Sequence, residues 1–314
     1  MTKLINKKIL VTGGAGFIGG HLVDKLIKEK ARVFIIDNLS TGRKENINPK
    51  AKFYKYDIRS PKIFQIFKKE KPEIVFHFAA HIEARESVKD PINDAQINIL
   101  GSLNILENCQ KFKVKKIIFA SSGGESYDNA KIIPTPESYP ASPRSPYGVA
   151  KLAVEKYLDS YFKMYGIPFT VLRYGNVYGP RQNPYGGSGV VAIFTHKILN
   201  GQECIVHGSG QQTKDYIFIE DAMNATLTAC KKNITGQLNI ASGKETSVLE
   251  IFSELKKITG FRREIKHVSL PTGVLKRGAL SIEKAKKIIG WQPQYNLEKG
   301  LRETVSWFKK NHEK

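Results

Sequence analysis

The chain has 314 residues, of which 41% are hydrophobic and 10% aromatic, so it can bury one large core or two smaller ones. These proportions exclude a disordered chain, and no apolar run reaches a membrane-spanning length, so a globular, enzyme-sized protein is predicted. The net charge of +21 is spread over predicted helix faces and loops, which favours a solvated lysine-rich surface over a nucleic-acid-binding patch.

Two further features bear on the cellular compartment. Met1-Thr2-Lys3 leads almost directly into the first predicted strand, which leaves no room for a signal peptide. The three cysteines, Cys109, Cys204 and Cys230, are scattered and lack metal-ligand spacing, as is usual in a reducing compartment. We therefore expect a cytoplasmic protein.

The first elements along the chain are a strand, a glycine-rich turn, a helix and a second strand. A β-branched run at 9–12 leads into the turn, and a second apolar run occupies 32–37. The glycines permit a sharp turn, a close backbone approach to a pyrophosphate and close packing of the helix on the strand. The free N–H groups at the helix start then point at the phosphates. The candidate phosphate-binding residues are Gly13, Gly16, Phe17, Ile18 and Gly19.

An acid ends the second strand. Asp37 lies 18 residues beyond Gly19 (37 − 19), where a carboxylate can accept hydrogen bonds from both hydroxyls of an adenosine ribose. The same carboxylate would repel a 2′-phosphate, so the sequence predicts NAD rather than NADP. Polar and apolar residues after the second and third strands are candidates for further cofactor contacts, namely Asn38, Ser40, Thr41, Gly42, Asp57 and Ile58.

Three more strands, predicted at 53–56, 73–78 and 116–120, alternate with helical segments such as 94–109. This alternation predicts a doubly wound parallel sheet of the Rossmann type, whose ligands bind beyond the carboxyl ends of the strands. His77 and His81 are four residues apart, but at a strand end and in the following loop, so we do not expect a metal site. Small or apolar residues at this strand end are cofactor candidates, namely Phe78, Ala79 and Ala80.

A helix predicted to begin after 143–146 carries Tyr147 and Lys151 on one face, one turn apart. A nearby ammonium and a cationic nicotinamide both favour the phenolate, so we expect the pKa of Tyr147 to fall from about 10 toward the operating pH. Tyr147 is then a usable general base.

With these residues in place, the sequence resembles the extended short-chain dehydrogenase/reductase family, and within it the nucleotide-diphosphate-sugar 4-epimerases. The resemblance spans nearly the whole chain, and UDP-glucose and UDP-galactose are the substrate pair that it favours. The sugar and the nucleobase stay open. The matching segments are 13–19, 37–42, 77–80, 98–101, Tyr147 with Lys151, 173–182, 215–217 and 289–291.

The resemblance implies a mechanism and several residue roles. Tyr147 takes the proton of the sugar 4-hydroxyl while a hydride passes from C4 to NAD, and a 4-keto sugar turns over before the hydride returns. Lys151 holds the nicotinamide ribose, and Asn98 and Tyr174 lie in the cofactor site. Arg277 clamps the diphosphate with its planar fork. The other implied substrate contacts are Asn176, Val177, Arg181, Val190, Val191 and Lys214.

The chain departs from the family pattern after the fifth strand. The usual Ser or Thr that shares a proton with the substrate is Gly123 here, so Ser122 or Ser121 is the candidate replacement. Glu125 matches a glutamate of related 4,6-dehydratases and glucuronate decarboxylases, but the adjacent acid of the dehydratases is Gly124. We interpret Glu125 as a solvated loop carboxylate.

Two further departures concern the substrate site. Lys214 replaces a usual arginine, which keeps the positive charge and loses the bidentate geometry. The loop 271–274 lacks the arginine and glutamate that are typical of the family.

The domain division follows from the resemblance. We expect a Rossmann NAD-binding domain at 1–175, with segments returning to it from about 208–232, and a smaller C-terminal domain, mainly for substrate binding, at 176–314. The helices predicted at 95–109 and 147–164 correspond to those that form a homodimer interface in the family.

Two alternatives stay open. One is a sugar-nucleotide 4,6-dehydratase or a UDP-glucuronate decarboxylase, which Glu125 favours and which Gly123 and Gly124 oppose. The other is a non-enzymatic nucleotide-sensing or nucleic-acid-binding protein on the same fold, favoured only by the charge of +21. Tyr147 and Lys151 argue against the second.

Overall fold

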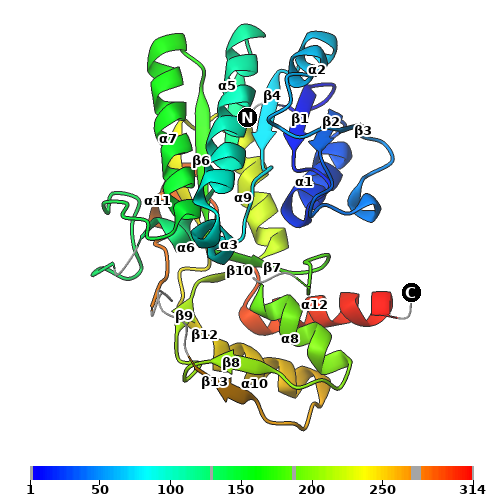
Figure 1. Ribbon diagram of the computed structural model, residues 1–314, viewed down its shortest axis with the longest axis vertical. Helices are drawn as coiled ribbons and strands as arrows, with labels where there is room; N and C mark the ends of the chain where they lie inside the picture. Colours follow the sequence, from blue (N-terminus) through cyan, green and yellow to red (C-terminus); the bar gives the residue numbers. More distant parts are fainter. Residues whose placement is uncertain (1–2, 128–129, 186–188, 270–276, 313–314) are drawn as a thin grey trace.

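The computed structural model describes residues 3–127, 130–185, 189–269 and 277–312 (Figure 1). A large sheet with flanking helices occupies the upper part of the view, and three helices with short strands lie below it. The description that follows is restricted to these residues.

Seven parallel strands form the central sheet, in the order β3-β2-β1-β4-β5-β6-β11. The predicted doubly wound Rossmann-type sheet is confirmed. Residues at the centre of β1, such as Leu10, are almost fully buried because helices cover both faces of the sheet. The strands are β1 (Lys8–Thr12), β2 (Arg32–Asp37), β3 (Lys52–Lys55), β4 (Ile74–His77), β5 (Lys116–Ser122), β6 (Phe169–Tyr174) and β11 (Gly236–Ile240).

Each face of the sheet packs on its own set of helices. Side chains alternate between the two faces of a strand, so Val11 joins one apolar cluster and Leu10 joins the other. The first cluster includes residues of α1 (Phe17–Lys28), α9 (Ile219–Lys231) and α11 (Glu283–Ile289). The second includes residues of α2 (Ile63–Glu70), α5 (Gly101–Lys111) and α7 (Pro146–Tyr165).

The strand order reverses between β1 and β4. The chain runs outward from β1 through β2 to β3 and then crosses back to β4 on the other side of β1. A crevice forms outside the carboxyl ends of the strands at such a point, and this is where doubly wound sheets bind ligands. The glycine-rich turn after β1 and the residues after β4 both lie there.

Between β4 and α5 the chain forms three short helical pieces in place of one long regular helix. They are α3 (Ala84–Lys89), α4 (Pro91–Ala95) and a π-helical turn at Gln96–Leu100, which continues directly into α5. Single π-helical turns of this kind are frequent at functional sites. Asn98 lies within this turn.

Below the central sheet in Figure 1 lies a region of further helices and short strands. Tyr174 ends β6, and after it the chain forms β7, which lies beside β10 in a separate two-stranded sheet. The helices are α8 (Val190–Leu199), α10 (Val248–Thr259) and α12 (Leu297–His312). The strands are β7 (Asn176–Tyr178), β8 (Ile205–His207), β9 (Thr213–Lys214), β10 (Tyr216–Phe218), β12 (Thr246–Ser247) and β13 (Lys266–Val268).

The expected division near residue 175 stays a prediction, as does the range of the returning segments. β11 pairs in parallel with β6 and so belongs to the central sheet, and it lies just beyond the range 208–232. α9, which precedes it, packs against α1 and the same sheet.

Candidate active site

The glycine-rich turn after β1 leaves no space for a side chain at two of its glycines, Gly13 and Gly19. Gly13 has a φ of +73°, and a Cβ there would lie 2.7 Å from the backbone nitrogen of Ala79. A Cβ on Gly19 would lie 2.1 Å from the carbonyl oxygen of Gly13. Among the described residues, no side chain caps the start of α1 at Gly16. The first N–H groups of α1 are therefore available to a phosphate.

Asp37 lies beside this turn and is buried. Its Oδ2 accepts the N–H of Ala15 at 3.0 Å, and its Oδ1 accepts the N–H of Leu39 at 2.8 Å. A carboxylate has about four lone-pair positions, so capacity remains for ribose hydroxyls. Burial raises the pKa of Asp37, and the two backbone N–H groups oppose this rise. Gly42 folds over the carboxylate, since a Cβ there would lie 2.8 Å from Oδ1.

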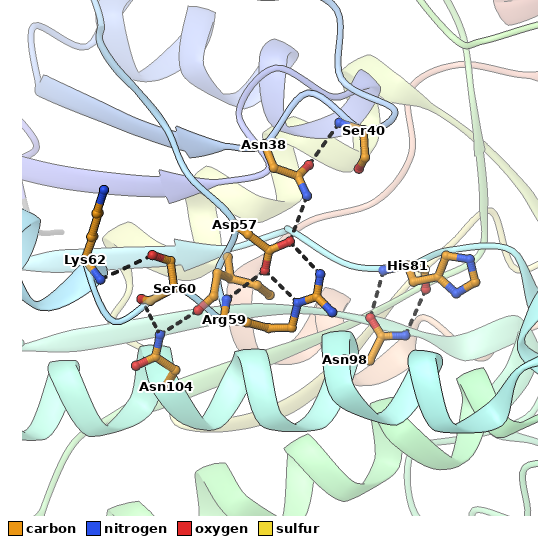
Figure 2. Close-up of polar contacts among 10 residues, drawn as sticks. Asn38, Ser40, Asp57, Arg59, Ser60, Lys62, His81, Asn98 and Asn104 are labelled. Carbon is orange, nitrogen blue, oxygen red and sulfur yellow. Dashed lines mark hydrogen bonds and ion pairs between the residues drawn. The ribbon is translucent and has the colours of Figure 1, made fainter.

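Figure 2 shows that the loops after β2 and β3 are joined by hydrogen bonds. Asn38 donates through Nδ2 to Asp57 Oδ2 at 3.0 Å and accepts the N–H of Ser40 at 2.9 Å. The guanidinium of Arg59 beside Asp57 holds the pKa of that carboxyl at about 2. Hydrogen bonds thus connect three of the predicted cofactor residues, namely Asn38, Ser40 and Asp57.

Thr12, at the end of β1, fixes the exit of β4. Its Oγ1 accepts the N–H groups of Phe78 and Ala79, each at 3.2 Å, and lies 2.7 Å from His77 Nδ1. The other ring nitrogen of His77 lies 2.8 Å from the hydroxyl of Ser102. Burial lowers the pKa of His77 to about 3, so this histidine is a neutral hydrogen-bonding group of the core.

Asn98 is held between a loop and a buried acid. Its Oδ1 accepts the N–H of His81 at 2.8 Å, and its Nδ2 donates to the His81 carbonyl and to Asp94 Oδ1, each at 2.9 Å (Figure 2 shows the two contacts to His81). Asp94 is fully buried, and its Oδ1 also lies 3.2 Å from His81 Nδ1. The sequence analysis assigns no role to Asp94.

In the part of the chain that the structure describes, no group of three or more His, Cys, Asp and Glu side chains is placed to hold a metal ion.

Tyr147 and Lys151 lie on one face of α7, as the spacing predicts. Lys151 Nζ is 5.6 Å from the centre of the Tyr147 ring and donates to the carbonyl of Ala120, at the end of β5, at 2.9 Å. Burial lowers the pKa of Lys151 to about 8. Lys151 is therefore still mostly protonated at pH 7.

The expected fall in the pKa of Tyr147 is not produced by the protein's own groups. Burial raises this pKa above its ordinary value, and the nearby carboxylates of Glu125 and Asp94 raise it further. The expectation rested on the ammonium of Lys151 and on a cationic nicotinamide, and it left out two acids that other segments bring near the ring. The positive charge of oxidised nicotinamide, when bound, would oppose this rise.

The start of α7 is fixed by side chains of two other segments. Ser145 caps the helix by accepting the N–H of Gly148 at 3.1 Å, and it donates its hydroxyl proton to Glu125 Oε2 at 2.8 Å. The N–H of Tyr147 donates to the hydroxyl of Ser87 at 3.1 Å. The interpretation of Glu125 as a solvated loop carboxylate is therefore wrong, because it is half-buried and bonded to the helix that carries Tyr147.

Ser121 and Ser122 end β5 with different partners. Ser121 is buried and donates its hydroxyl proton to Glu155 at 2.6 Å, beside the ion pair of Glu155 with Arg173. Ser122 is half-buried and precedes α6 (Gly123–Ser126), where its hydroxyl oxygen accepts the N–H of Glu125 at 3.3 Å. A hydroxyl that accepts still has a proton to donate, so Ser122 is the serine able to serve a ligand.

A cleft of about 400 Å³, part of it open to solvent, separates α6 from the C-terminal segments. Gly123 and Gly124 line one side, and the predicted substrate residues Asn176, Lys214 and Arg277 lie around it. The structure thus brings three residues from distant parts of the sequence to one cavity. The loop 271–274, singled out in the sequence, lies outside the described residues.

Asp215 is one of the residues that line this cleft. Its buried carboxylate accepts hydrogen bonds from the N–H groups of Ser242, Gly243 and Leu280 at 2.7 to 3.1 Å, and from the hydroxyl of Ser242 at 2.6 Å. Burial raises the pKa of Asp215, and these donors oppose the rise. One acid therefore ties two strand ends and the segment of Arg277 together.

Several other predicted ligand residues are not among those that line this cleft. The guanidinium of Arg181 pairs with Asp24 of α1 at 2.8 Å and does not line the cleft. Val191 is buried in the apolar cluster, as is Val177, while Val190 begins α8 and is half-buried. The hydroxyl of Tyr174 lies 2.6 Å from that of Thr226, inside the core. Ile58 is likewise buried.

Comparison with known proteins agrees with this geometry. Residues 9–241 match the NAD dependent epimerase/dehydratase family, and the chain belongs to it. It is thus an NAD-dependent enzyme, and the predicted class of nucleotide-sugar epimerases of the extended short-chain dehydrogenase/reductase family is confirmed.

Three similar proteins show how the family varies. The structure of the Thermotoga maritima UDP-glucose 4-epimerase with UDP-glucose is 46% identical, has a TM-score of 0.95 and covers 97% of this chain and 99% of its own. The UDP-N-acetylglucosamine 4-epimerase of Methanobrevibacter ruminantium, in complex with UDP-N-acetylmuramic acid, is 34% identical with a TM-score of 0.92, and the match covers 98% of this chain and 99% of that one. UDP-glucuronic acid decarboxylase 1 of Xenopus tropicalis is 30% identical, over 98% of this chain and 73% of that protein.

The residues present fit NAD. A Cβ would clash at Gly13 and at Gly19, the start of α1 has no side-chain cap, and Asp37 retains acceptor capacity for ribose hydroxyls. None of the helices within the described ranges is long and apolar enough to cross a membrane.

Proposed function

We propose that this enzyme epimerises a UDP-sugar at C4, with UDP-glucose and UDP-galactose as its substrate pair. The observation that carries the proposal is the placement of Tyr147 and Lys151 on one face of α7, with Lys151 tied to the end of β5 beside the nucleotide-binding crevice. The 46% identity to the Thermotoga maritima enzyme supports this substrate pair.

The cofactor would be held by three groups of residues. The turn from Gly13 to Gly19 contacts the pyrophosphate, Asp37 binds the adenosine ribose, and Asn98 with Lys151 holds the nicotinamide end. When bound, NAD supplies hydride transfer chemistry at C4 of the sugar.

The protein's own residues move and hold protons. Tyr147, as phenolate, takes the proton of the sugar 4-hydroxyl and later returns it. Ser122 donates a hydrogen bond to the same sugar oxygen and keeps its proton, a role for which Ser121 is not free because it is bonded to Glu155. Lys151 keeps its positive charge near the ring and stabilises the phenolate.

The diphosphate of the substrate would bind between Lys214 and Arg277, two cations that line the cleft. Asn176 lies beside them and donates to the Asp215 carbonyl at 3.3 Å, which fixes its amide at the cleft wall. Arg181 is paired with Asp24, so its predicted contact with the diphosphate is not part of this proposal.

A dehydratase or decarboxylase is the weaker candidate. Glu125 is the residue that favours a dehydratase or a decarboxylase. In this structure its carboxylate accepts a hydrogen bond from Ser145 at the start of α7. We therefore assign Glu125 to the support of Tyr147 and not to chemistry on the substrate.

The direct test is a proton NMR time course with UDP-glucose in D₂O and no added cofactor. The proposal expects UDP-galactose to appear with no deuterium in the sugar ring. A 4-keto-6-deoxy sugar that contains deuterium would instead identify a dehydratase. Parallel runs with UDP-N-acetylglucosamine and UDP-glucuronic acid decide whether the substrate is a different UDP-sugar.

The role assigned to Glu125 leads to a pH prediction. Glu125→Gln keeps the acceptor for Ser145 and removes a negative charge that opposes the Tyr147 phenolate. The pKa of Tyr147 then falls, so the rising limb of kcat against pH moves to lower pH, while most of the activity at its optimum is retained. Glu125→Ala, which also loses the hydrogen bond, is expected to retain most activity as well. A loss as large as that of Tyr147→Phe in either variant would show that Glu125 takes part in the chemistry.

We also propose that the enzyme is a homodimer and that it is located in the cytoplasm. Exposed apolar side chains of α7, namely Val149, Tyr157, Phe162, Met164 and Tyr165, support pairing with a second copy. All three cysteines are free and buried, as suits a reducing compartment. Light scattering at twice the mass of one chain would support the dimer, and the mass of a single chain would contradict it.

A further inference from the structure

Arg277 at the cleft is bound by the acidic side chain of Glu245. Its Nε donates to Glu245 Oε1 at 3.0 Å, and its Nη2 donates to Oε2 at 2.5 Å. Two parallel bonds of this kind fix the plane of a guanidinium as well as its position. Glu245 therefore determines where the positive charge of Arg277 lies.

Glu245 is itself held in place. The hydroxyl of Thr213 donates to Glu245 Oε1 at 2.5 Å, and Arg277 and Thr213 together hold the pKa of Glu245 below its ordinary value. The side chain of Glu245 is 22% exposed, whereas that of Arg277 is 67% exposed. The acid is thus the more buried partner, and the arginine is the one exposed to a ligand.

The same segments hold the second cation of the cleft. Glu245 directly precedes β12, and Thr246 in that strand pairs with Lys214 in β9. The backbone after Arg277 is anchored where Leu280 donates to Asp215 at 3.1 Å. Lys214 and Arg277 are therefore held by segments that are bonded to one another. Glu245 ties the side chain of Arg277 to these segments.

We propose that Glu245 is a positioning residue, which holds the guanidinium of Arg277 ready for the diphosphate of the substrate. This inference rests on the function proposed above. A guanidinium has five N–H donors, and Glu245 uses Nε and one donor of Nη2. Among the described residues, the edge formed by Nη1 and the second Nη2 donor has no hydrogen-bond partner, so it can donate to two phosphate oxygens.

Kinetic constants distinguish a positioning role of Glu245 from a purely structural one. The diphosphate does not react, so its contact with Arg277 is equally strong in the bound substrate and in the transition state. Losing such a contact raises KM and leaves kcat nearly unchanged. A residue that only stabilised the fold would lower the melting temperature instead.

The experiment is a double-mutant cycle measured with UDP-glucose as substrate and UDP as competitive inhibitor. Glu245→Ala is expected to raise KM and the UDP inhibition constant about fivefold to tenfold, with kcat within about twofold of the wild type. Arg277→Ala is expected to raise both constants at least as much. The double variant should match Arg277→Ala alone, because Glu245 acts only through that arginine.

Other outcomes separate this inference from the proposed function. A KM that is unchanged or lower in Glu245→Ala, with a raised KM in Arg277→Ala, overturns the role of Glu245 and leaves the diphosphate site standing. Additive effects in the double variant also overturn it. An unchanged KM in Arg277→Ala overturns both the inference and the diphosphate site. Melting temperature and NAD content, measured for each variant, exclude a folding defect as the cause of a raised KM.

Discussion

Tyr147→Phe is expected to lower kcat on UDP-glucose by about a thousandfold, in the range of general acid–base contributions. The substitution removes only the hydroxyl group. The backbone N–H of Tyr147 still donates to Ser87, and the cap by Ser145 does not involve the side chain of Tyr147. The start of α7 should therefore keep its position, and the loss should appear in kcat with NAD content and melting temperature unchanged.

Tyr157→Phe is the matched control, because Tyr157 lies on the same helix and is 40% exposed. It should retain wild-type kcat. If Tyr147→Phe kept more than about a tenth of the wild-type kcat, another group would have to be the base.

Gly19→Ala is expected to abolish retention of NAD. A Cβ at this position would lie 2.1 Å from the carbonyl oxygen of Gly13, and that oxygen belongs to the backbone and cannot rotate away. The start of α1 would have to shift, and its N–H groups would no longer point at the pyrophosphate. We also expect a loss of about 1 to 3 kcal/mol in the free energy of unfolding, as is typical of overpacked sites.

Gly20→Ala provides the control for this variant. Its Cβ would lie 3.3 Å from Asn46 Cβ, a contact that small shifts can relieve. NAD released by denaturing each purified variant measures the effect, and melting temperature measures the stability. A Gly19→Ala protein that contained as much NAD as the wild type would contradict the assignment of this turn.

Features that depend on neighbouring residues were predictable from the sequence. The strand at 9–12, the glycines after it and Asp37 lie within one strand-turn-helix-strand unit, so their spacing alone defines the geometry. Tyr147 and Lys151 are likewise one helical turn apart, and α7 begins within one residue of the predicted start.

Contacts between distant segments were not predictable in this way. The donor and acceptor of the Tyr147 to Ser87 bond are 60 residues apart, and those of the Arg277 to Glu245 bond are 32 apart. The rise in the pKa of Tyr147 was missed for a related reason, because both its main cause, burial, and the added effect of acids in α4 and α6 depend on tertiary packing. Asp94 left only one signal in the sequence, an acid one helical turn before Asn98.

The most direct test of the account uses UDP-glucose with deuterium at C4, in ordinary water and without added cofactor. We expect the UDP-galactose formed to retain deuterium at C4, because the hydrogen removed from that carbon is the one returned to it. Carbon-bound deuterium is read by NMR of the isolated product. UDP-galactose that had lost the C4 deuterium to solvent would contradict the account.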